Sequence, residues 1–155
     1  MKKIQACVWA IAALLLVACG ESKPTPELVL QDLHGKKVSL QQLQGKSAVI
    51  NMWATWCAPC RREMPVLQQA QQNHPHIQFV LLNQGEKAPV VSAYLQKNQI
   101  QLPNVWLDES MQARAVLPYQ GLPSTYFLNQ QGEVVAHSLG ELTPVQLQQY
   151  LQQIQ

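Results

Sequence analysis

Apolar runs and helical patterns alternate along most of the chain. Apolar residues dominate positions 48–53 and 77–82, and each run has the length of a buried strand. Between them, Met64, Leu67 and Ala70 recur at the spacing of one helix face, and the pattern ends near Pro75. Strands that alternate with helices are typical of a layered α/β domain, because each sheet face must be covered.

The flanking segments extend this pattern at both ends. Residues 28–40 alternate around the turn signal His34-Gly35, which predicts a short hairpin. A second hairpin is expected around Gly132. The remaining predicted elements are a helix over 90–98, a strand over 105–107, a short helix ending near Val116, and a terminal helix opened by Thr143-Pro144.

The first 26 residues have the pattern of a leader and a tether. Lys2 and Lys3 precede an apolar run over 4–18, which is shorter than the ~20 residues of a spanning helix but suits a secretory leader. The run ends in Leu-Val-Ala-Cys-Gly at 16–20, which resembles the bacterial lipoprotein signal, where cleavage precedes a cysteine that becomes lipidated. The alternative is a plain signal peptide followed by a chance cysteine. The prediction is a signal peptide at 1–18, a lipidated Cys19 with its tether at 19–26, and one domain at 27–155.

Composition narrows the class of function. With 155 residues, of which 47% are apolar, the chain has enough material for one packed core. Its formal charge of +2 comes from Lys2 and Lys3 in the leader, so the domain itself is near neutral. Such a domain lacks the basic surface that nucleic-acid binding requires. We therefore expect no nucleic-acid partner.

The chain has four cysteines, and only two belong to the predicted domain. Cys7 leaves with the leader and Cys19 would carry the lipid, so Cys57 and Cys60 remain. A structural zinc site needs four ligands, whereas the chain offers no second cysteine pair and only a His-Pro-His sequence at 74–76. We expect no metal or other cofactor. In an oxidising compartment the pair is either redox-active or a structural disulfide.

The two cysteines stand where the first apolar run gives way to the helical pattern. At a helix start, free N–H groups and the helix dipole favour negative charge, and a thiol there ionises more easily. Cys57 is thus the predicted nucleophile, and Cys60, on the same side of the first turn, can attack a mixed disulfide formed by Cys57. Pro59 suits an early helical position. The charged residues 61–63 are expected on the solvated surface of this helix.

The stretch WATWCAPCRREMP at 53–65 resembles the thioredoxin superfamily, and more narrowly the membrane-tethered TlpA/ResA-type thiol–disulfide oxidoreductases. A second match is GLPSTYF at 121–127, and the resemblance runs from about Pro26 to the C-terminus. It implies a thioredoxin-like three-layer α/β/α sandwich with an N-terminal β-hairpin and a helical insertion after the second core strand.

The resemblance also implies roles for single residues. Pro123 would follow a cis peptide bond and face the cysteine pair, with Leu122 offering its N–H and C=O to a substrate strand. Trp56, from its own position immediately before the predicted nucleophile, is expected to shield the disulfide and contact a partner. Asn51 occupies the place of thioredoxin's buried acid, and Glu86 is similar to a glutamate of the ResA-like members. Glu86 is therefore expected to tune the second cysteine and carry its proton.

The resemblance implies thiol–disulfide exchange on protein substrates in the cell envelope, with a lipid anchor and a membrane thiol donor. The expected direction is reduction, as in cytochrome c maturation. An oxidase or isomerase is the alternative within this class. A copper-binding module would need wider cysteine spacing and an added His or Met ligand. A single-cysteine peroxidase would need a longer motif before Cys57 than Thr55 supplies, and a structural disulfide would not need an exposed helix start flanked by tryptophans.

Overall fold

The computed structural model of the protein describes residues 28–155. The predicted signal peptide, Cys19 and the tether over 19–26 lie outside the described residues. Within residues 28–155, no helix has the length and apolar character needed to cross a membrane.

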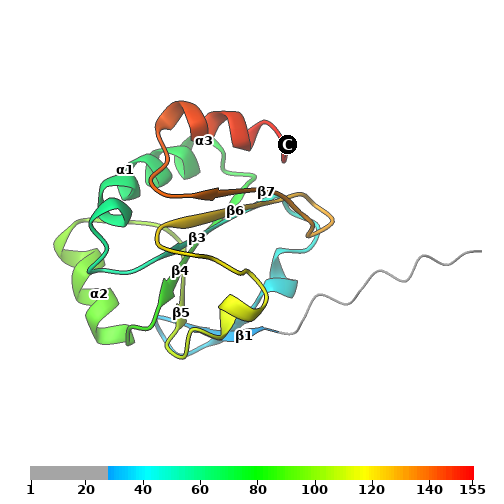
Figure 1. Ribbon diagram of the computed structural model, residues 1–155. Coiled ribbons are helices and arrows are strands. Elements are labelled where there is room, and N and C mark those ends of the chain that lie inside the picture. Colours follow the sequence, from blue (N-terminus) through cyan, green and yellow to red (C-terminus); the bar gives the residue numbers. More distant parts are fainter. Residues whose placement is uncertain (1–27) are drawn as a thin grey trace, which may run out of the picture.

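A seven-stranded mixed sheet forms the centre of the domain, in the order β2-β1-β5-β4-β3-β6-β7 (Figure 1). Strands β3, β4 and β5 pair in parallel, and β6 and β7 continue the sheet in antiparallel fashion. The strands are β1 Val29–Asp32, β2 Lys37–Ser39, β3 Ala48–Trp53, β4 Gln78–Gln84, β5 Asn104–Asp108, β6 Ser124–Leu128 and β7 Val134–Leu139.

The two faces of the sheet are covered differently. The helices α1 (Ala58–Asn73), α2 (Ala88–Lys97) and α3 (Pro144–Leu151) all contribute to one core cluster on the same face. The other cluster includes residues of β1, β2 and the two 3-10 helices, η1 (Leu40–Leu43) and η2 (Gln112–Ala115). In Figure 1 the three α-helices accordingly lie on one side of the sheet, and the short yellow helix η2 lies on the other.

These elements confirm the predicted thioredoxin-like α/β fold. The N-terminal hairpin is present as β1 paired with β2, with Leu30 opposite Val38, and α2 is the helical insertion after the second core strand. The terminal helix begins as its sequence predicts. Thr143 caps it in a reciprocal hydrogen-bonded arrangement with Gln146, because both side chains satisfy backbone groups that the first turn leaves free.

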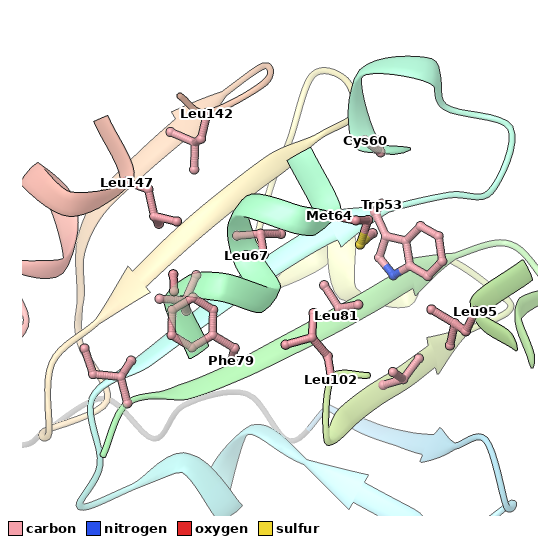
Figure 2. Close-up of a cluster of buried hydrophobic side chains, with 14 of the residues drawn as sticks. Trp53, Cys60, Met64, Leu67, Phe79, Leu81, Leu95, Leu102, Leu142 and Leu147 are labelled. Carbon is pink, nitrogen blue, oxygen red and sulfur yellow. The ribbon is translucent and has the colours of Figure 1, made fainter. Parts of the chain in front are cut away.

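Strand β3 is buried along its whole length, so both of its faces are core. Because side chains alternate, Val49 and Trp53 belong to the cluster beneath the helices, whereas Ile50 and Met52 belong to the opposite cluster. Figure 2 shows the Trp53 indole close to Met64 of α1. By the same alternation, Asn51 faces the helices, so a polar side chain points at α1 from the middle of the sheet.

Candidate active site

Cys57 and Cys60 form a disulfide bond at the junction of β3 and α1. Cys57 is the N-cap residue of α1, and its sulfur accepts a hydrogen bond of 3.3 Å from the Cys60 N–H. Pro59 lies in the first turn, where its missing N–H costs nothing. The predicted position of Cys57 at the helix start is confirmed. The first turn therefore directs one backbone N–H, that of Cys60, at its sulfur.

The two sulfurs differ in access. Cys60, in the first turn of α1, is fully buried, whereas Cys57 retains 5% exposure. Trp56, the preceding residue, is 69% exposed and projects from the surface beside the pair. An incoming thiol or disulfide therefore meets Cys57 first.

The loop before β6 lies beside the cysteine pair because of the strand register. Ser124 pairs with Met52, which places the preceding Pro123 at the level where β3 ends and leads to Cys57. The Leu122–Pro123 peptide bond is cis, as predicted. Among residues 28–155, no hydrogen bond engages the N–H or C=O of Leu122, so both groups are free to pair with a docked strand.

The prediction that residues 61–63 are solvated is wrong for Glu63. Arg61 and Arg62 are exposed, but the Glu63 side chain is fully buried. Glu63 lies three residues after Cys60, on the buried side of α1 that also carries Met64. Helix positions three apart are neighbours, with Cβ atoms about 5–6 Å apart. A buried carboxyl group therefore lies one helical turn from Cys60.

Glu63 is held by donors from two other elements. Asn51 of β3 donates to Oε1 at 2.6 Å, and the Leu142 N–H donates to Oε2 at 2.9 Å. Asn51 also donates to the Thr125 hydroxyl oxygen of β6 at 2.9 Å. The position at which thioredoxin has an acid is thus an amide here, and the carboxyl group reaches it from α1.

Burial raises the pKa of Glu63 to about 7, because the ionised carboxylate loses its hydration. The hydrogen bonds from Leu142 and Asn51 favour the ionised form and oppose this shift, and the nearby charge of Glu141 adds to it. A group with such a pKa can both accept and donate a proton near neutral pH. The sequence did not predict the burial of Glu63, because this residue follows two arginines in a charged run. The one signal available was that Glu63 lies three residues after Cys60, on the same side of the helix.

Glu86, the predicted proton carrier, lies at the same end of the sheet. It accepts hydrogen bonds from the Thr55 N–H at 2.7 Å, the Thr55 hydroxyl and the Asn83 amide at 2.7 Å. Both of its oxygens are therefore engaged, and it joins the loop before Cys57 to the end of β4. The structure thus brings Glu86 to the cysteine loop through Thr55.

No group of three or more His, Cys, Asp or Glu side chains within residues 28–155 is arranged to hold a metal ion. The histidines of the 74–76 sequence lie away from the cysteine pair, where His74 contacts Gln148 of α3 at 3.3 Å.

Comparison with known proteins agrees with this geometry. Residues 22–137 match the AhpC/TSA family. The thiol-disulfide oxidoreductase ResA of Bacillus cereus is 31% identical over 134 residues, which are 85% of this chain and 77% of that protein. The solved structure of DsbF from Mycobacterium tuberculosis superposes with a TM-score of 0.76 at 23% identity, over 83% of this chain and 95% of that one, and shows the shared fold. A DsbF homologue from Corynebacterium diphtheriae has a TM-score of 0.73 at 27% identity, over 84% and 85% of the two chains.

The buried carboxyl group predicts a pH-dependent stability. Since the pKa of Glu63 is higher in the folded protein than its ordinary 4.5, ionisation costs more in the folded state. The contribution to stability is complete below pH 4.5 and is lost as pH rises through about 7. Between pH 4 and pH 8 the oxidised protein should lose on the order of 3 kcal/mol of unfolding free energy from this group. Denaturant unfolding across this range measures it.

Glu63→Gln should flatten this profile, because the introduced amide does not ionise. Glu133→Gln, a substitution of an exposed carboxylate, is the matched control and should retain the wild-type profile. An unchanged slope in Glu63→Gln would show that Glu63 does not titrate in this range.

Proposed function

The chain belongs to the AhpC/TSA family and to its ResA-type thiol–disulfide oxidoreductases, and we propose that it reduces disulfide bonds of proteins outside the cytoplasm. The observation that carries the proposal is the Cys57–Cys60 disulfide at the N-terminus of α1, in which Cys57 retains 5% exposure and Cys60 none. The leader pattern at 1–19 supports the location and a lipid anchor.

In the proposed reaction, the Cys57 thiolate attacks one sulfur of a substrate disulfide. A Cys57–substrate bond forms, the substrate S–S bond breaks, and the second substrate sulfur leaves with the electron pair and takes a proton. Cys60 then loses its proton and attacks the Cys57 sulfur. The first substrate sulfur leaves, the Cys57–Cys60 disulfide closes, and the substrate has gained two electrons. A membrane dithiol would restore the reduced pair.

Resolution requires a base, since Cys60 is buried away from water. The sequence predicts Glu86 as this base, and its contact with Thr55 supports a role at the loop. Glu63 is a second candidate, because it is one helical turn from Cys60 and has a pKa of about 7. We propose that Glu63 accepts the proton of Cys60 during resolution and returns it afterwards. Glu86 holds the loop before Cys57 through Thr55 and influences the cysteine pKa values by its charge.

The surroundings of Cys57 support a protein substrate. Trp56 is largely exposed beside it. Met111 is 49% exposed, and its side chain lies against Gly85, next to the Glu86 contact with the cysteine loop. Exposed large apolar side chains around a reactive group are typical of a surface that contacts another protein.

The reduction potential of the Cys57–Cys60 pair tests the proposed direction. A reductant should lie nearer to thioredoxin, at about −270 mV, than to the oxidant DsbA, at about −120 mV. Equilibration with glutathione buffers, followed by tryptophan fluorescence or thiol trapping, measures it. A value near −120 mV would favour the oxidase alternative, and one near −180 mV the isomerase.

Cys57 should be the first thiol to react in the reduced protein, because the helix start stabilises its thiolate. Alkylation over a pH series should label Cys57 with an apparent pKa below the ~8.5 of a free thiol. Peptide mapping identifies the labelled residue. Preferential labelling of Cys60 would reverse the two roles.

Glu86→Gln should lower the cysteine pKa values, because a nearby negative charge disfavours a thiolate. If Glu86 takes the Cys60 proton in place of Glu63, Glu86→Gln should also slow resolution of a trapped mixed disulfide by ~10²-fold, the usual value of general acid–base help. Thiol titration and stopped-flow reduction of a small disulfide measure the two effects. Glu63→Gln, studied in parallel, identifies which carboxyl group serves Cys60. If Glu86→Gln changes neither quantity, Glu86 only holds the loop.

Cys19→Ser should give a protein that is no longer acylated at this position and is released from membranes. Stable attachment needs two or more acyl chains, so losing the lipidated residue removes the anchor. Membrane fractionation and mass spectrometry of the N-terminus measure these properties. The lipoprotein interpretation is wrong if the wild type carries no lipid and both proteins fractionate alike.

A further inference from the structure

Beside the cis-proline loop, one part of the sheet face opposite the α-helices carries exposed side chains. Strand β7 forms the edge of the sheet there. Its residues His137 and Leu139 pair with Tyr126 and Ser124, which places them on the face opposite the helices, as Tyr126 belongs to that cluster. Leu139 is 53% exposed.

This region contains a cavity of about 500 Å³ between β7 and the loop before β6. Its lining residues are Pro118, Tyr119, Gln120, His137 and Leu139. None of them carries a carboxylate, ammonium or guanidinium group, so the lining favours an uncharged side chain.

The walls of the cavity are held by contacts behind them. The His137 ring stacks on Tyr126 with 4.3 Å between ring centroids. The Tyr119 hydroxyl donates to Gln84 at 3.0 Å, and the Arg114 guanidinium lies 5.0 Å from the Tyr119 ring centroid. The cavity is therefore preformed, which lowers the entropy cost of filling it.

The cavity adjoins the cis-proline loop, since Gln120 in its lining lies two residues before Leu122. A Cβ atom placed on Gly121 would lie 3.9 Å from Cδ1 of Leu139, so the Leu139 side chain lies beside the residue that precedes Leu122. At the end of β7, the Gly140 N–H donates to the Pro123 carbonyl at 2.9 Å. A polypeptide that reaches Cys57 past the free backbone groups of Leu122 therefore passes this cavity.

We propose that this cavity is a subsite for one apolar or aromatic side chain of the substrate polypeptide, close in sequence to the cysteine that reacts with Cys57. The inference rests on the proposed function, since it names the feature of the protein substrate that this site selects. The selected residue lies within a few positions of the reacting cysteine, because Gln120 is two residues before Leu122 and a strand advances ~3.3 Å per residue.

The test uses the full chain with Cys7, Cys19 and Cys60 replaced by serine, so that Cys57 is the only thiol. Its mixed disulfide with glutathione is equilibrated with peptides that contain one cysteine in an Ala/Ser background. One phenylalanine is moved from four positions before the cysteine to four positions after it. In each reaction the peptide thiol replaces glutathione on Cys57 without net oxidation. Differences in the exchange constant between peptides therefore report the contacts of the peptide side chains.

We expect exchange constants roughly five- to tenfold higher for one or two neighbouring phenylalanine positions, the gain from burying most of an aromatic ring. Leu139→Ser should reduce that ratio to about one. Gln120→Glu should instead select a lysine at the same position. Val145→Ser is the matched control, because Val145 is an exposed apolar residue of α3, and it should keep the phenylalanine preference.

The outcomes separate the two proposals. If Cys57 forms mixed disulfides but no phenylalanine position differs from alanine, the subsite is overturned and the proposed function stands. A preference that survives both Leu139→Ser and Gln120→Glu also overturns the subsite. If Cys57 forms no mixed disulfide even with glutathione, the proposed function fails, and the subsite fails with it.

Discussion

The pairing of β3 between β4 and β6 is the constraint on which the site depends. Because β3 runs parallel to β4, the C-terminal ends of both strands lie at the same end of the sheet. The loops that follow them carry Cys57 and Glu86. Because β6 runs antiparallel to β3, its first residue, and with it Pro123, lies at that same end of the sheet. Burial of β3 on both faces makes this register costly to change, since a shift by one residue would exchange its two faces.

The buried polar groups beneath the cysteines show how this strand connects to the chemistry. Burying a carboxyl group away from water costs free energy. Hydrogen-bond donors from β3 and from the segment before α3 offset part of this cost for Glu63. These hydrogen bonds hold α1 against the sheet, and the remaining cost appears as the raised pKa. Glu63 therefore does two things: it holds α1, which bears the cysteine pair, against the sheet, and it titrates near neutral pH.

The two faces of the sheet differ in how completely they are covered. The face under the α-helices contains the larger apolar cluster and encloses Cys60 and Glu63. On the opposite face the covering elements are short, and the exposed side chains of β7 adjoin the cis-proline loop. The disulfide thus lies on the buried side of the sheet, and the proposed substrate subsite lies on the more open side.

Local patterns determined much of this protein, because the features concerned depend on neighbours in the chain. Apolar periodicity predicted the strands and helices, and the place of Cys57 at the end of an apolar run predicted its N-cap position. The resemblance of the 121–127 motif correctly implied the cis bond before Pro123. Only the tertiary structure decided the environment of Glu63, because a charged residue in an Arg-Arg-Glu run is buried only where distant donors such as Asn51 and Leu142 meet it. The cavity beside Leu139 likewise depends on the pairing register of β6 with β7, which the hairpin pattern around Gly132 did not specify.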